Sequence, residues 1–145
     1  LLEMLLQSQE PLIRVFPAIP DHWKDVSFVN LRAEGAFLVS ALRKNAHTTI
    51  VIVTSEKGGK VSIETDIAAA NIIVQSNKYK ANYKILTQNN RSTINISTRA
   101  GEIITIRDKN NATDMISPIK QTSFSNQYWG LQVNHKESII KLNRK

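Results

Sequence analysis

The sequence predicts an all-β fold, an antiparallel β-sandwich with a short helical segment at its N-terminal end. Short runs of β-branched and aromatic residues recur at roughly ten-residue spacing along the chain. Turn residues such as Gly58-Gly59, Asn89-Asn90 and Gly101 separate these runs. No long stretch repeats apolar residues with the helical period. Together these features favour two packed sheets of short strands.

Composition sets the outer limits on fold and function. The 145 residues correspond to one domain. With 41% hydrophobic and 21% charged residues, the chain is too apolar for disorder. No apolar run approaches the roughly 18 residues that a membrane span needs, so we expect no membrane partner. The absence of cysteine excludes disulfides, thiolate nucleophiles and cysteine-based zinc sites.

The formal net charge is +7, which can indicate a nucleic-acid surface. However, the basic residues are scattered along the predicted strands, and only the stretch 136–145 is dense. They are not interleaved with aromatic residues as in proteins that bind single-stranded nucleic acid. We therefore interpret them as solvated strand faces and expect no nucleic-acid partner.

The first ten residues predict a helix. Leu1, Leu2, Leu5 and Leu6 follow one helical face, and Pro11 ends the helix at or before the residue that precedes it. Two turns of helix are too short to be stable alone, so we expect them to pack on this domain or on a helical domain before it.

The predicted strands span 12–16, 28–34, 37–41, 48–54, 60–65, 71–75, 81–86, 92–98 and 102–107, with a last hairpin at 128–133 and 138–142. A stiff connector, 17–20, carries two prolines and leads to Trp23, which we expect to be wedged between packed layers. The stretch 55–59 is predicted as a hairpin loop. Alternation predicts that Val29, Leu31 and Ala33 share one face of their strand, with Asn30, Arg32 and Glu34 on the other.

Residues 3–9 read E-M-L-L-Q-S-Q, and 13–20 read I-R-V-F-P-A-I-P, followed by Trp23 and by L-R-A-E-G-A-F at 31–37. The segment 97–102 reads S-T-R-A-G-E. These motifs resemble the C-terminal region of glycoside hydrolase family 95, the inverting α-L-fucosidases and their relatives, over residues 1–108. The chain departs from the family pattern at Gln9, Pro11, Asn30, Glu34 and Ala36, as a diverged member would.

The resemblance implies three parts: 1–10 as the end of a helical catalytic barrel, 11–108 as a C-terminal β-sandwich, and 109–145 as a β extension packed on the sandwich. Inverting glycosidases use two carboxyl groups about 6.5–9.5 Å apart, and in this family they precede the present chain. The resemblance therefore implies no catalytic residue here and no activity of the chain alone. It also implies a bacterial periplasmic or secreted parent enzyme.

The role implied for this domain is to stabilise the barrel of the same polypeptide, its expected partner, and to shape one rim of the active site. The residues expected to pack between the domains are Leu2, Leu5, Leu6, Phe16, Pro17, Pro20 and Trp23.

The alternative hypothesis is a carbohydrate-binding module that uses Trp129, Tyr128 and Trp23, with glycans as the partner. Sugars stack on exposed aromatic rings. Adjacent residues of a strand point to opposite faces, so at most one of the first two rings is exposed. Packing in the core or between domains is the favoured interpretation of both.

Other chemistry finds little support in the sequence. His22, His47 and His135 lack the spacing of a metal site, and the serines lack a nucleophile elbow. Glu64 and Asp66 share one face of a predicted strand, a pair that could hold a cation but that we interpret as a solvated face. We expect no metal and no cofactor.

Overall fold

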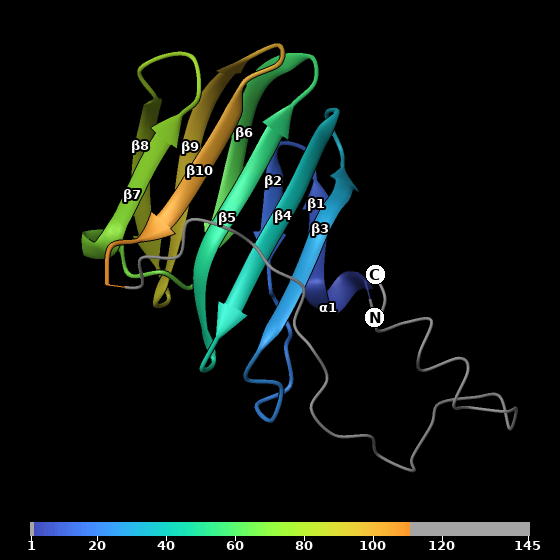
Figure 1. The fold of residues 1–145 in the computed structure, drawn as a ribbon, viewed down its shortest axis with the longest axis vertical. Coiled ribbons are helices and arrows are strands. Elements are labelled where there is room, and N and C mark those ends of the chain that lie inside the picture. Colours follow the sequence, from blue (N-terminus) through green and yellow to red (C-terminus); the bar gives the residue numbers. More distant parts are fainter. Residues whose placement is uncertain (1, 111–145) are drawn as a thin grey trace, which may run out of the picture.

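The computed structural model describes residues 2–110, which form two five-stranded sheets packed face to face (Figure 1). The elements are α1 (Leu2–Leu5), β1 (Leu6–Gln9), β2 (Leu12–Val15), β3 (Val26–Ala33), β4 (Phe37–Lys44), β5 (His47–Ser55), β6 (Gly58–Thr65), a 3-10 turn η1 (Ala69–Asn71), β7 (Ile72–Ser76), β8 (Asn82–Gln88), β9 (Arg91–Arg99) and β10 (Ile103–Asp108). The predicted antiparallel β-sandwich is confirmed. The last predicted hairpin, 128–142, lies outside the described residues.

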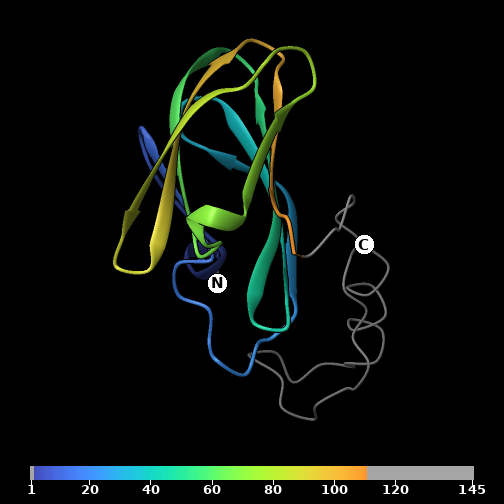
Figure 2. The ribbon, with the colours of Figure 1, turned by 90° about the vertical axis from the view of Figure 1, so that its left-hand side faces the viewer.

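Sheet A has the strand order β1-β2-β6-β9-β8, and sheet B has the order β3-β4-β5-β10-β7. Figure 2 shows the two layers edge-on. The strands β2 and β6 run parallel, whereas the other pairings within residues 2–110 are antiparallel. A sandwich of this kind buries one face of each sheet against the other.

The core lies between the sheets and follows the period of two predicted for the strands. Phe37, Val39 and Ala41 of β4 point inward, as do Val61 and Ile63 of β6, and each is at most 3% exposed. They meet the inward side chains of the facing strands in one continuous apolar cluster. Burial of these β-branched and aromatic side chains is the main source of stability.

The prediction that 55–59 closes a hairpin is wrong. The strand β5 pairs with β4 and β10 in sheet B, whereas β6 pairs with β2 and β9 in sheet A. The two strands flank a tight glycine-containing turn as predicted, but that turn carries the chain from one sheet to the other. A turn sequence shows where the chain reverses direction, but it does not determine whether the two strands beside the turn pair with each other.

The crossing from β5 to β6 is tied to a second crossing, from β9 to β10. Ser55 is buried and its backbone is bonded on both sides. Gly101 N donates to Ser55 O (2.7 Å), and Ser55 N donates to Glu102 O (2.9 Å). The Glu102 carboxylate, 2% exposed, accepts bonds from Arg99 N (2.8 Å) and from the Ser76 hydroxyl (2.6 Å). We call this set of bonds the crossing cluster. Its buried polar groups are therefore satisfied, as stability requires.

The orientation predicted for Val29 is also wrong, since this side chain is 54% exposed. A bulge shifts the pairing of β3 with β4 between Phe28 and Leu31. Asn30 takes a φ of 53° there, and its N–H donates to the Ser40 hydroxyl (2.8 Å). Because a bulge inserts an extra residue, strict alternation fails across it.

The outward faces of the two sheets differ in character. On sheet A, pairing aligns Lys60 with Ser97 and Asn82, and Ser62 with Asn95 and Lys84. On sheet B, the outward positions of β4 and β5 include Leu38, Leu42, Ile50 and Ile52. We call these the polar outer face and the apolar outer face.

Candidate functional site

The segment that carries the predicted interdomain residues begins as a helix and continues as a strand. The helix α1 ends at Leu5, and Leu6–Gln9 forms β1, so the prediction of a helix to about residue 10 is wrong from Leu6 onward. The strand β1 pairs antiparallel with β2, with Leu6 opposite Val15. Edge pairing onto a sheet satisfies these backbone groups, which overrides the modest helical preference of four residues.

This N-terminal segment, residues 2–25, is bonded to both sheets. Phe16 N donates to Leu5 O (2.8 Å), which ties α1 to the end of β2. On the side of sheet B, Glu34 N donates to the Ser8 hydroxyl (2.8 Å), and Glu10 N donates to the Glu34 carboxylate (2.8 Å). The β1–β2 hairpin is therefore anchored on the open edge between the sheets.

An ion-pair cluster fixes β2 to the centre of sheet A. The Glu64 carboxylate accepts bonds from Arg91 Nε (2.7 Å) and Arg14 Nε (3.2 Å). Arg91 also donates through its second nitrogen, Nη2, to Val15 O (3.0 Å). Glu64 and Arg91 are 19% and 28% exposed, so this pair is more strongly shielded than an ordinary surface ion pair. The cluster joins β2, β6 and β9.

The structure divides the predicted interdomain residues into two groups. Phe16 is buried in this domain's own core, where its ring meets the Phe28 ring edge-on with centroids 5.3 Å apart. Leu5 and Leu6 are half-buried and pack against that core. Pro17, Pro20 and Trp23 are half-buried in the connector, and Leu2 is the first residue of α1. Phe16 thus has no surface left for another domain.

Trp23 lies in a connector that is bonded at both of its ends. The backbone N–H of Trp23 donates to Pro20 O (2.9 Å). The Trp23 ring meets the His22 ring edge-on, with centroids 6.1 Å apart. Just beyond it, Asn45 N donates to the Asp25 carboxylate (2.9 Å), and Ala46 N donates to Lys24 O (2.9 Å). The backbone next to Trp23 is therefore tied to the β4–β5 turn, while its half-buried ring does not belong to the core between the two sheets.

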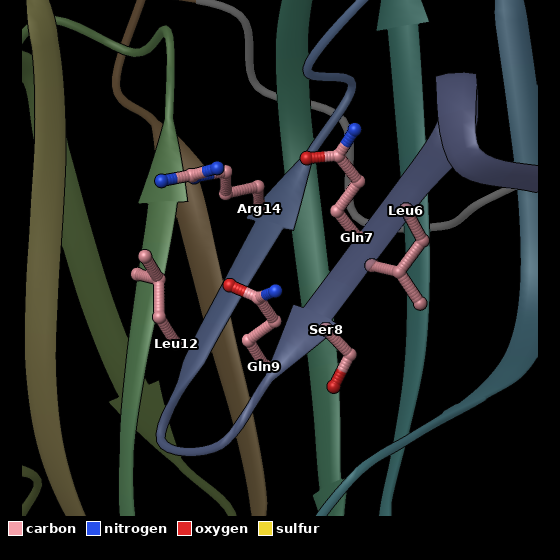
Figure 3. Close-up of a pocket in the computed structure, with 6 residues that line it drawn as sticks. All are labelled: Leu6, Gln7, Ser8, Gln9, Leu12 and Arg14. Carbon is pink, nitrogen blue, oxygen red and sulfur yellow. The ribbon is translucent and has the colours of Figure 1, made fainter.

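A pocket of about 410 Å³ opens over the β1–β2 hairpin. It is lined by Leu6, Gln7, Ser8, Gln9, Leu12 and Arg14 (Figure 3). Figure 3 shows Gln7 and Gln9 on one side of β1, and Leu6 and Ser8 on the other. The two amides of β1 therefore lie on one side of the strand, while Leu6 packs against the core and the Ser8 hydroxyl accepts the bond from Glu34 N on the other.

The remaining candidate residues do not converge. Tyr128, Trp129 and His135 lie outside the described residues. His22 and His47 are exposed, and within residues 2–110 no three His, Cys, Asp or Glu residues gather as a metal site would require. Asp66 pairs with Arg43 at 3.0 Å, so both carboxylates once considered for a cation are paired with arginine.

Two features of the surface escaped sequence reasoning. The bonds of Arg14 and Arg91 to Glu64 join residues 50 and 27 positions apart in the chain. The alignment of Lys60 with Asn82 across β9 is likewise non-local. The sequence shows charged residues of opposite sign on the predicted strands, but it does not show which strands will pair and bring those charges together.

Comparison with known families agrees with this architecture. Residues 7–106 match the model of the C-terminal domain of glycoside hydrolase family 95. A comparison with curated proteins finds no match. Among the described helices, none has the length and apolar character needed to cross a membrane.

The fold and this match together define the class of protein, which is a β-sandwich accessory domain of a glycoside hydrolase. Because the match covers more than half of the chain, the chain belongs to the family of glycoside hydrolase family 95 C-terminal domains. It is thus a non-catalytic domain, and the catalytic domain of the same polypeptide is its partner.

Proposed function

We propose that this domain stabilises the catalytic barrel of its own polypeptide and shapes one rim of the active site. The observation that carries the proposal is the anchoring of the N-terminal segment to both sheets. A connector bonded in this way transmits the position of one domain to the next, whereas a free linker would not.

The contact surface would consist of Leu2, at the start of α1, and of the half-buried residues Leu5, Leu6, Pro17, Pro20 and Trp23. Phe16 would act indirectly, since its burial holds the start of the connector in place. Interfaces between domains bury apolar and aromatic groups of this kind.

The test uses the full-length polypeptide carrying Trp23→Ala. We expect the thermal transition of the barrel to fall by roughly 2–8 °C, because loss of an aromatic contact weakens the interface. The catalytic efficiency on an aryl α-L-fucoside should fall as well. Leu86→Ala, at an exposed position of β8, is the matched control. Equal transitions for both variants and the unaltered protein would overturn the proposal.

We further propose that the parent is an inverting, α-L-fucosidase-like bacterial enzyme of the periplasm or the secreted fraction. The family assignment supports this proposal. The test is to assay the full-length protein on aryl α-L-fucosides and galactosides while following the anomer released. The present chain alone should show no turnover on either substrate.

We also propose that residues 109–145 form the expected extension and cover the apolar outer face. Leu42 and Ile50 point outward from sheet B yet are 3% and 0% exposed, and both stand outside the core cluster. The strand β10 ends at Asp108 within the same sheet. Ending the full-length protein after Asp108 should increase binding of a dye that reports exposed apolar surface; unchanged dye binding would contradict the proposal.

The second candidate function is carbohydrate binding by Trp23 together with Tyr128 and Trp129. The partial exposure of Trp23 on the surface favours it, since a sugar can stack on a ring held in this way. Calorimetry with neutral oligosaccharides should then show affinity that Trp129→Ala weakens. No binding at millimolar sugar would remove this candidate.

A further inference from the structure

A second surface pocket lies on sheet A, over β6, β9 and β8. It encloses about 420 Å³ and is lined by Pro11, Lys60, Val61, Ser62, Asn82, Tyr83, Lys84, Asn95, Ile96 and Ser97. We call it the sheet A groove. Its size falls within the range of about 300–1,000 Å³ that small-molecule sites occupy.

The groove presents two parallel rows of polar groups. One row runs from Lys60 through Ser97 to Asn82, and the other from Ser62 through Asn95 to Lys84. Neighbouring strands in a sheet lie about 4.8 Å apart, which sets the spacing of the groups along each row. The sheet thereby offers hydrogen-bonding groups at fixed positions.

One amide of the groove has a defined orientation. The Ser62 hydroxyl donates to Asn95 Oδ1 at 2.6 Å. This bond uses the amide oxygen, and within residues 2–110 the Asn95 Nδ2 group donates to no protein acceptor. Its N–H groups are therefore available to a hydroxyl or carboxylate oxygen of a ligand.

The charge of the groove is positive. Among the described residues, no acidic residue lines the groove, and neither Lys60 nor Lys84 forms an ion pair. Glu64, on the same face of β6, is already neutralised by Arg14 and Arg91. Two ammonium groups at either end of a carboxylate-free pocket favour an anionic ligand.

The approach to the groove adds basic groups. Residues 78–84 read K-Y-K-A-N-Y-K, with three lysines and no acid. The Arg99 guanidinium lies over the Tyr79 ring at 4.4 Å from its centroid. Tyr83 aligns with the buried Ile96, so its ring lies on the opposite face of β8 from Asn82 and Lys84.

From this arrangement we infer that the sheet A groove binds an acidic glycan, a sugar chain that bears carboxylate or sulfate groups. Lys60 and Lys84 contact the anionic groups, and the amides and hydroxyls of both rows bond sugar hydroxyls. This site is separate from the interdomain surface proposed above. It would bind carbohydrate, as the second candidate function would, but it does not use Trp23, Tyr128 or Trp129.

The lining favours a glycan over a nucleic acid. Proteins that bind single strands combine a basic track with several stacking rings, whereas the outward-facing residues described for this groove are two lysines and uncharged hydrogen-bonding groups. Hydroxyls and amides recognise the hydroxyls of a sugar, while a phosphate backbone depends chiefly on ionic contacts.

The test measures binding of fluorescently labelled oligosaccharides to the full-length protein. The probes are an oligogalacturonide, a heparin-derived oligosaccharide, a neutral oligosaccharide and a single-stranded oligonucleotide. We expect the Lys60→Ala/Lys84→Ala double variant to lose about tenfold or more in affinity for an acidic probe. The control is Lys44→Ala/Lys57→Ala, which removes the same charge from exposed positions outside the groove and should change affinity less than about twofold.

A second variant separates specific recognition from charge attraction. Asn95→Ala keeps the net charge, and we expect it to weaken binding of the acidic glycan while leaving oligonucleotide binding unchanged. Preference for the oligogalacturonide over the heparin probe, or the reverse, identifies carboxylate or sulfate as the natural group. Equal losses in the double variant and the control, or tighter binding of the oligonucleotide, would overturn the inference. Circular dichroism of each variant confirms that the fold is retained.

Discussion

The two outer faces of this sandwich are built on sheets of equal strand number yet present opposite chemistry. On sheet A, lysine, serine and asparagine side chains point outward and surround a groove. On sheet B, the outward positions of β4 and β5 carry leucine and isoleucine, and Leu42 and Ile50 are excluded from water. One face is thus suited to a polar ligand, whereas the other is stable only when covered.

The difference between the two outer faces shows that buried side chains in this fold are not confined to the core between the sheets. The strand β5 reads T-T-I-V-I-V-T over 48–54, with apolar residues on both faces. Strands buried on both faces read as continuous hydrophobic runs, whereas strands with one wet face alternate. The strand β9 alternates isoleucine with threonine, asparagine and serine, as expected for a strand with one polar face.

The largest expected effect would come from removing a covered side chain of the apolar outer face. Ile50→Ala should lower the free energy of unfolding by about 2–5 kcal/mol, because it removes a fully buried side chain. Ser97→Ala, on the exposed polar outer face, should change it by less than about 0.5 kcal/mol. Urea denaturation measures both. If the two variants unfold at the same urea concentration, the two faces do not differ in stability.

A smaller effect is expected from the ion-pair cluster, where the polar outer face contributes to stability. Glu64→Gln should cost about 1–2 kcal/mol, since the shielded Arg91 loses its counter-charge. Glu56→Gln breaks an exposed pair with Arg32 and should cost less than about 1 kcal/mol. High salt should narrow the gap between the first variant and the unaltered protein only slightly. A larger loss for Glu56→Gln would contradict this view.

The polar exception on the apolar outer face is the bond between Ser40 and Asn30. Ser40→Ala removes the acceptor of a partly buried N–H, and we expect a loss of about 1 kcal/mol in unfolding free energy. Ser27→Ala, on the same strand pair, is the control and should be near neutral, because the Ser27 hydroxyl forms no such bond within residues 2–110. Hydrogen exchange of the Asn30 amide should accelerate only in the first variant; unchanged exchange would sink the assignment.

The smallest effect concerns the apolar exception on sheet A. Leu86 is 59% exposed on β8, so Leu86→Ser should change the unfolding free energy by less than about 0.5 kcal/mol. A calorimetric scan suffices as the measurement. A loss of several kcal/mol would mean that this side chain is covered by another part of the protein.

Local pattern was enough to locate the strands but not to assign their partners. The inward positions of β4 and β6 follow directly from alternation, as Val39 and Ile63 show. The turn after Ser55 was placed correctly, yet no local signal distinguishes a hairpin from a crossing between sheets. That choice depends on Ser55 meeting Glu102, 47 positions later in the printed sequence.

Short apolar stretches were ambiguous for a related reason. Leu5 and Leu6 fit a helical face, but four residues give little helical stability, and pairing with β2 decides the outcome from Leu6 onward. The sheet A groove was invisible in sequence because Lys60 and Lys84 come to line the same groove only through the pairing of three strands. Family resemblance located the domain, and non-local pairing created its surfaces.

The crossing cluster has a mechanical consequence. Both crossings between the sheets at Ser55 and Glu102 share hydrogen bonds, so sliding one layer over the other would break them together. A tensile load entering through the N-terminal segment would therefore be carried by the sandwich as a stiff block rather than absorbed by shear. The domain would behave as a rigid lever, with its groove held at constant orientation relative to the point of attachment.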